Sequence, residues 1–144
     1  MKPQMTVALI AIAFLATAAV AHDGVKNPAV KARMHSMDVI SENMKTIGKM
    51  AQRQVAFDAD AAQAAVDEIT RQATQIPSLF EAQETDPKSE ARPDIWVNWN
   101  DFVAQSNALV SAGQSVDASS IEALGQGLAT IGGTCRSCHM KYRT

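Results

Sequence analysis

The 144-residue sequence has little of several residue types that mark common protein classes. Two cysteines are too few for a disulfide-rich scaffold, and five prolines with seven glycines exclude a collagen-like chain. Thirteen basic and fifteen acidic side chains give a net charge of −2, so no excess of positive charge indicates nucleic-acid binding. Aromatic residues make up only 5% of the chain although 47% of it is hydrophobic, so large core side chains are scarce.

The hydrophobic residues are concentrated at the N-terminus, where 16 of the first 21 residues are apolar against about 41% of the remainder. An apolar stretch at 7–20 follows a lysine, and Ala19-Val20-Ala21 is an A-x-A cleavage signal. An uncleaved membrane anchor is the less favoured alternative, because a spanning helix needs ~20 apolar residues. We therefore expect a cleaved secretory signal peptide at 1–21, one soluble domain at 22–144, and export to the periplasm.

The rest of the chain has helical periodicity, and no segment alternates with a period of two for long enough to indicate a strand. Asn27 followed by Pro28 predicts the start of the first helix. A second helix, capped by Asp58 or Asp60 and alanine-rich on its inner face, is expected to end at Pro77.

The second half of the domain begins with a long polar connection at 78–92. Pro93 is expected to open a third helix that Gly113 ends, and Asp117 or Ser119 to cap a fourth that carries the C-terminal cysteines. Four amphipathic helices with three connections predict an all-α fold, an antiparallel four-helix bundle. Its core is short of large side chains, which suggests that it is built around another group.

Both cysteines lie in the C-x-x-C-H motif Cys135-Arg136-Ser137-Cys138-His139 near the C-terminus. Residues three apart on a helix lie on one face about one turn apart, so both thiols can form thioethers with the two vinyl groups of a haem. The adjacent histidine then provides a neutral imidazole as axial iron ligand. The motif therefore predicts one covalent haem c, held by Cys135 and Cys138 with His139 on the iron.

Three other interpretations explain this motif less well. A thioredoxin-like site would need a strand before the motif in a βαβ setting. A structural zinc site needs further ligands, and the other histidines are only His22 and His35. A plain disulfide would leave His139 without a role. A haem-free thiol or metal-binding module therefore stays the minor alternative.

At these residues the sequence resembles the cytochrome c-prime family, the class II c-type cytochromes. The similarity includes the C-terminal C-x-x-C-H followed by Tyr142-Arg143, and Gly132 three residues before Cys135. It also includes Val30-Lys31-x-Arg33 in the first helix and the A-R-P-D-I-W segment at 91–96. The resemblance implies an up-down-up-down bundle with the haem between helices near one end.

The resemblance also implies roles for individual residues. His139 corresponds to the proximal iron ligand, and Arg33 to an arginine near a haem propionate; a solvated helix-face arginine is the alternative reading of Arg33. Some family members leave the distal side of the iron vacant and bind nitric oxide or carbon monoxide. Others place a methionine of the first helix there, and the corresponding residue here is Met37. Met34, one turn away on nearly the same face, is expected to line the pocket or to serve as the reserve candidate for the distal ligand.

Helix geometry agrees with Met37 as the distal candidate. If the first and last helices are antiparallel neighbours, Met37 lies ~13 Å from the start of the first helix and His139 ~6 Å from the end of the last, so both are at one end of the bundle. Met44 and Met50 lie ~10 and ~20 Å further along, which is too far. His35 points about 160° away from Met37 around the helix and is expected to face solvent.

These features predict an electron carrier with His139 and Met37 on the iron, and a high-spin gas-binding protein with a vacant distal site is the alternative. The sequence shows no catalytic triad, carboxylate pair or phosphate-binding loop, so we do not expect an enzyme. The expected partners are redox proteins that the sequence does not identify. We expect no nucleic acid, no stable membrane insertion after cleavage, and a monomer or a homodimer.

Overall fold

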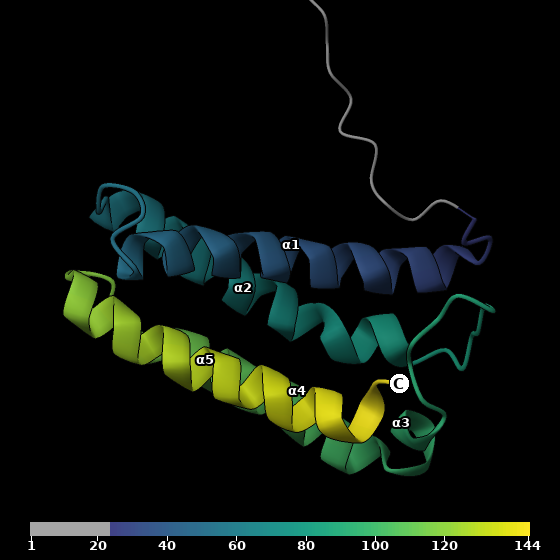
Figure 1. Cartoon of the computed structure of the whole chain (residues 1–144). Helices are drawn as coiled ribbons and strands as arrows, with labels where there is room; N and C mark the ends of the chain where they lie inside the picture. Colours follow the sequence, from purple (N-terminus) through teal and green to yellow (C-terminus); the bar gives the residue numbers. More distant parts are fainter. Residues whose placement is uncertain (1–23) are drawn as a thin grey trace, which may run out of the picture.

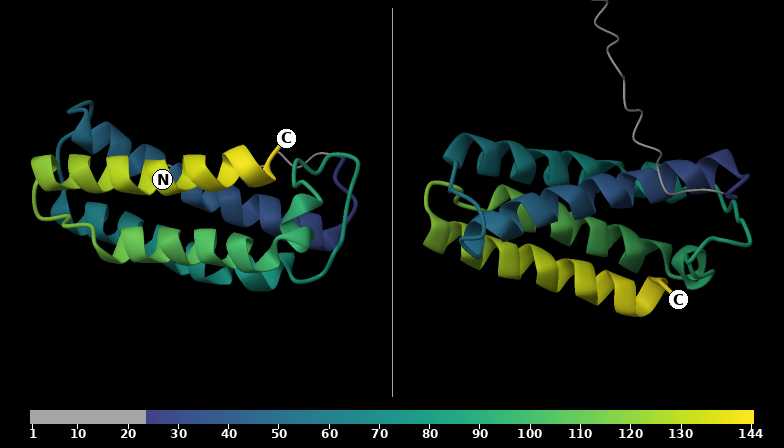
Figure 2. Two further views of the ribbon diagram at one scale, coloured as in Figure 1. Left: turned by 90° about the horizontal axis from the view of Figure 1, so that it is seen from below. Right: turned by 45° about the horizontal axis from the view of Figure 1, so that its top comes forward.

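The computed structural model describes residues 24–144, so the expected signal peptide at 1–21 lies outside the described residues. The helices are, in chain order, α1 (Pro28–Ala51), α2 (Ala59–Phe80), α3 (Asp94–Val97), α4 (Trp99–Gln114) and α5 (Ile121–Tyr142). The long helices α1, α2, α4 and α5 run alternately up and down, and α5 packs back against α1 (Figure 1 and Figure 2). The predicted all-α four-helix bundle is confirmed, with the short α3 added before α4. Within 24–144, no helix combines the length and the apolar character needed to cross a membrane.

The side-chain caps of the first two helices were predicted correctly. The side chains of Asn27 and Asp58 accept backbone N–H groups in the first turns of α1 and α2. The predicted cap of α5, Asp117 or Ser119, was wrong. The cap is Ser120, whose hydroxyl accepts the N–H of the third residue of the helix. Asp117 instead accepts the N–H of Ser119, which forms a turn ahead of the helix.

α2 continues through Pro77 to Phe80, so the prediction that Pro77 ends this helix was wrong. Proline has no N–H to donate to the carbonyl four residues earlier, which belongs to Ala73. That carbonyl accepts the hydroxyl of Ser106 on α4, at 2.8 Å. Because a tertiary hydrogen bond satisfies the freed acceptor, the helix gains its last residues and the polar connection begins at 81 rather than 78.

The third predicted helix is two helices, because the backbone at Asn98 leaves the helical region with φ −113° and ψ 41°. The indole N–H of Trp96 donates to the carbonyl of Phe80 at 2.7 Å, which holds α3 against the end of α2. α4 then runs one residue past Gly113, which was predicted to end it. Gly113 instead allows α4 to pack closely against α2, since a Cβ at this position would lie 2.1 Å from the hydroxyl oxygen of Thr70 on α2.

The bundle is narrow at one end and wide at the other. We call the end where α1 finishes and α5 begins the narrow end, marked by Gly48, Gly127 and Leu128; the opposite end, with Met37 and the C-x-x-C-H motif, is the wide end. α1 and α5 form the loosest of the four pairs of adjacent long helices, and they diverge towards the wide end (Figure 1 and Figure 2). The interior between them is therefore filled by direct helix contact only at the narrow end.

Candidate functional site

Cys135, Cys138 and His139 lie in the last two turns of α5, at the wide end. Both cysteines are half-buried free thiols whose side chains pack against the hydrophobic core. His139 is also half-buried. The helix therefore places the two thiols one turn apart and the imidazole beside them, as the sequence motif predicted.

Burial keeps these three side chains neutral near neutral pH. Burial raises the pKa of Cys135, and it is also the main cause that raises the pKa of Cys138 to about 11, with smaller contributions from the charges of Cys135 and Asp101. The pKa of His139 is lowered, first by burial and then by the charge of Arg143. The imidazole is thus in the neutral form that binds iron.

The end of α5 is tied to α4 and to the 81–93 connection. Asp101 of α4 accepts hydrogen bonds from the hydroxyl of Tyr142 and from Lys141, the latter at 3.1 Å. Glu90 accepts from the guanidinium of Arg143 at 2.6 Å. Asp101 and Glu90 were missed by sequence analysis, because their partners lie 41 and 53 residues away and no local pattern marks such pairs.

Met37 and His139 occupy matching positions on α1 and α5. Gly48 of α1 lies against Leu128 of α5, since a Cβ at Gly48 would be 3.9 Å from a methyl carbon of Leu128. Met37 lies eleven residues before Gly48, and His139 lies eleven residues after Leu128. Eleven residues are about three helical turns and about 16 Å, so each returns to the same face of its helix. Because the helices are antiparallel, this register places Met37 and His139 at about the same level along the bundle.

The face of α5 that carries His139 has open space at Gly132. Gly132 is half-buried and lies seven residues before His139, on the same face. A Cβ at Gly132 would meet no atom within 4 Å. Two thiols one turn apart, a neutral imidazole and open space beside Gly132 together fit a covalently attached haem c.

Arg33 is only 3% exposed, so the alternative reading as a solvated arginine was wrong. Its guanidinium donates to three backbone carbonyls at the end of α2 and just after it, those of Leu79, Ala82 and Glu84. Burial lowers the pKa of Arg33, and the charge of Glu84 partly opposes this shift. The contact with a haem propionate stays a prediction, since three of the five guanidinium N–H groups are already donated elsewhere.

The remaining candidates on α1 and α5 lie as follows. Met34 is half-buried, and its place in the pocket lining stays a prediction. His35 is exposed, as expected. Met140, next to His139 on the same helix, is 68% exposed.

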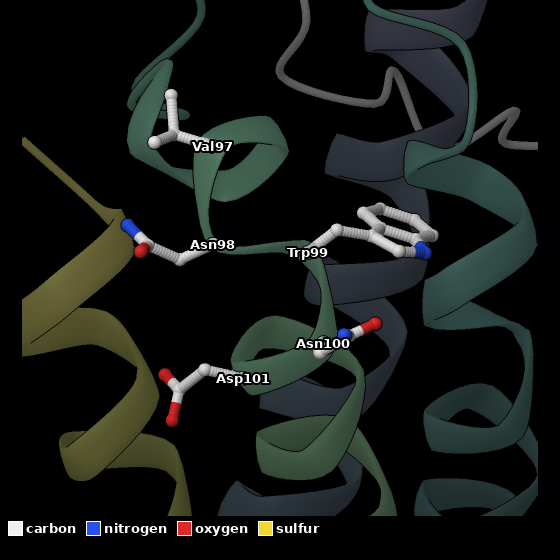
Figure 3. A pocket seen from close by; sticks show the side chains of 5 residues that line it. All are labelled: Val97, Asn98, Trp99, Asn100 and Asp101. Atoms are coloured by element: carbon white, nitrogen blue, oxygen red, sulfur yellow. The ribbon is translucent and has the colours of Figure 1, made fainter.

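A separate pocket lies at the junction of α3 and α4 (Figure 3) and is lined by Val97, Asn98, Trp99, Asn100 and Asp101. In Figure 3, the side chains of Asn98 and Asp101 point towards α5, whereas Trp99 points to the opposite side. This pocket contains none of the predicted site residues. It lies beside the end of α5, to which Asp101 is bonded.

Comparison with known proteins finds relatives that are all named as c-type cytochromes. Residues 28–143 match the family model described as Cytochrome C'. The chain is 32% identical over 117 residues to "Cytochrome c-556" of Agrobacterium tumefaciens (strain B2A), across 79% of this chain and 95% of that protein. It is 27% identical over 119 residues to "Cytochrome c'" of Pararhodospirillum photometricum, across 79% of this chain and 94% of that protein.

The fold has close counterparts among solved structures. Cytochrome c' from Rhodopseudomonas palustris superposes with a TM-score of 0.75 and 23% sequence identity, covering 83% of this chain and 98% of that chain. The family match extends over both α1 and the C-x-x-C-H motif of α5. The chain therefore belongs to the cytochrome c-prime family and carries covalently bound haem c.

Proposed function

We propose that this chain is a periplasmic electron carrier. One haem c is attached through Cys135 and Cys138, with His139 as the proximal and Met37 as the distal iron ligand. When bound, the haem supplies a one-electron change between ferric and ferrous iron. The exchange partners are redox proteins of the same compartment. A curated relative with 32% identity is named cytochrome c-556, which is compatible with this role.

The matching register of Met37 and His139 is the observation that carries the proposal. Counted from Gly48 and Leu128, the two residues stand at about one level on neighbouring helices. Figure 1 shows that α1 and α5 diverge towards the end at which α5 finishes. Met44, four residues before Gly48, stands opposite Gly132 by the same register, which is closer to the narrow end. Met37 is therefore the methionine of α1 whose thioether best faces the imidazole of His139.

The surrounding residues hold the turn of α5 that carries the imidazole of His139. The carbonyl of His139 accepts the N–H of Arg143 at 3.0 Å, and the bonds of Asp101 and Glu90 hold the same turn of α5. A thioether on the sixth position would exclude small ligands and raise the reduction potential. A thioether has no proton to lose, so this ligation does not depend on deprotonating Met37.

A gas-binding protein with a vacant distal site is the second candidate. The side chain of Met37 packs against the hydrophobic core, so it can serve as a packing residue without binding iron. Relatives named cytochrome c' accompany those named c-556. In this case the protein would bind nitric oxide or carbon monoxide on the side of Met37.

Absorption spectra of the purified holoprotein distinguish the two functions. We expect a low-spin reduced spectrum that does not change with carbon monoxide, and a Met37→Ala variant that becomes high-spin and binds carbon monoxide. Met44→Ala, which removes a half-buried methionine of the same helix, is the matched control and should stay low-spin. A wild-type spectrum that shifts with carbon monoxide, or a Met37→Ala spectrum identical to wild type, would contradict the proposal.

A further inference from the structure

Arg33 binds the end of α2 and the start of the 81–93 connection at three points. Its Nε donates to the carbonyl of Leu79 at 2.9 Å, one terminal nitrogen donates to Glu84 at 2.8 Å, and the other donates to Ala82. Carbonyls at the end of a helix have no partner within that helix, and they form the negative end of its dipole. A buried cation at this position therefore satisfies acceptors that the fold would otherwise leave without partners.

The same guanidinium lies between two aromatic rings. Its central carbon is 4.7 Å from the ring centre of Phe80 and 5.5 Å from that of Trp96. The rings belong to α2 and α3, and Trp96 also donates its N–H to the carbonyl of Phe80. Arg33 thus joins α1, α2 and α3 through hydrogen bonds and cation–π contacts.

Two further side chains hold the 81–93 connection against the start of α1. Asn27 donates to the carboxylate of Glu84 at 2.6 Å. Asp86, 8% exposed, accepts the backbone N–H groups of Lys26 and Asn27. The first turns of α1 are therefore set by contacts with the end of α2 and with this connection.

At the wide end, α1 diverges from α5, so contacts with α2 and with the 81–93 connection set the position of α1 there (Figure 1 and Figure 2). Met37 follows Arg33 by four residues, about one turn further along the same helix. We propose that Arg33 is a positioning residue: it anchors α1 so that the thioether of Met37 stands at binding distance from iron. This inference rests on the proposed ligation by Met37.

The test compares Arg33→Met, Arg33→Lys and the wild-type holoprotein. Methionine keeps the apolar stem and removes every N–H donor, whereas lysine keeps the charge with a single donor group. Arg53→Met is the matched control, because Arg53 is exposed and pairs with Glu122 near the narrow end. The measurements are the low-spin fraction of the ferric protein, the carbon monoxide affinity of the ferrous protein, the reduction potential, and hydrogen exchange of the amides at 81–93.

We expect Arg33→Met to lose most of its low-spin absorption, to gain carbon monoxide binding, and to exchange the 81–93 amides faster. Arg33→Lys should lie between Arg33→Met and wild type, and Arg53→Met should match wild type. If Arg33→Met does not fold, Arg33→Lys decides the same question. The inference is overturned if the Arg33 variant that folds stays low-spin and excludes carbon monoxide, whatever its thermal stability. A change in reduction potential alone would also overturn it, in favour of a propionate contact.

A wild-type protein that is already high-spin would show that the proposed function has failed. The positioning role is then judged from the carbon monoxide affinities. A several-fold change in Arg33→Met, absent in Arg53→Met, would still support an anchor that sets the distance between α1 and the iron. Equal affinities in wild type and Arg33→Met would overturn it.

Discussion

The two ends of the bundle bring the same helices together in different ways. At the narrow end, glycine permits close contact: a Cβ at Gly127 would lie 2.6 Å from a methyl carbon of Val116, and Gly48 lies against Leu128. At the wide end, α1 and α5 diverge, and large aromatic side chains gather around Phe102 (Phe80, Trp99 and Tyr142, with ring centres 5.1 to 5.7 Å away).

This difference explains the scarcity of large core side chains in the sequence. Small residues close the bundle at the narrow end, where no cofactor is needed. The aromatic residues support the end that receives the haem, and half-buried cysteines face its interior.

The largest expected effect tests the space at the wide end. Gly132→Ala would place a methyl group in the unfilled space of α5, so we expect a large loss of bound haem per protein, measured by the pyridine haemochrome assay. Helix propensity alone would favour alanine by roughly 0.5–1 kcal/mol, so it cannot cause this loss. The matched control is Gly133→Ala, because Gly133 is exposed on the adjacent position. Equal haem content in both variants would argue against haem beside Gly132.

A smaller effect is expected when a methyl group is added where α4 packs closely against α2. Gly113→Ala would bring its Cβ 2.1 Å from the hydroxyl oxygen of Thr70, so we expect a loss of about 1–3 kcal/mol in the free energy of unfolding. Gly48→Ala should gain up to about 1 kcal/mol, since its Cβ would make an ordinary 3.9 Å contact. Urea unfolding followed by circular dichroism measures both. Restoration of stability in Gly113→Ala by adding Thr70→Ala would confirm the cause, and a stable Gly113→Ala single variant would contradict it.

The smallest effect concerns α1 and α2, which stay packed at both ends. Ser36 donates to Gln72 at 2.9 Å, and Gln72 donates to Glu68 at 2.8 Å. The pKa of Glu68 is lowered from 4.5 to about 2, mainly by hydrogen bonds from Arg71 and then Gln72. A carboxyl with a depressed pKa contributes stability above its unfolded value and loses it as the pH falls through its folded value.

We therefore expect Glu68→Gln to be slightly less stable than wild type at neutral pH, with the two converging between pH 4.5 and about 2. The effect should be small, because the pair with Arg71 is partly exposed. Thermal unfolding across this pH range measures it, and Glu122→Gln near the narrow end serves as the control. A stability difference that does not change with pH would show that the charge of Glu68 is not its cause.

Local signals in the sequence predicted several parts of the fold well. Asn27 and Asp58 cap helices because side-chain oxygens satisfy the N–H groups of the next turn, an interaction that needs only neighbouring residues. The end of α2 could not be predicted in this way. The carbonyl that Pro77 leaves free is bound by Ser106, which comes from another helix.

The sequence by itself determined the helical pattern and the chemistry of the C-x-x-C-H motif, because both depend on spacings of three or four residues along one chain. The tertiary structure decided how that motif is placed. It brought Asp101 and Glu90 to the end of α5 and buried Arg33 at the end of α2. These contacts join residues more than 40 positions apart, and only the packing of whole helices determines which of them meet.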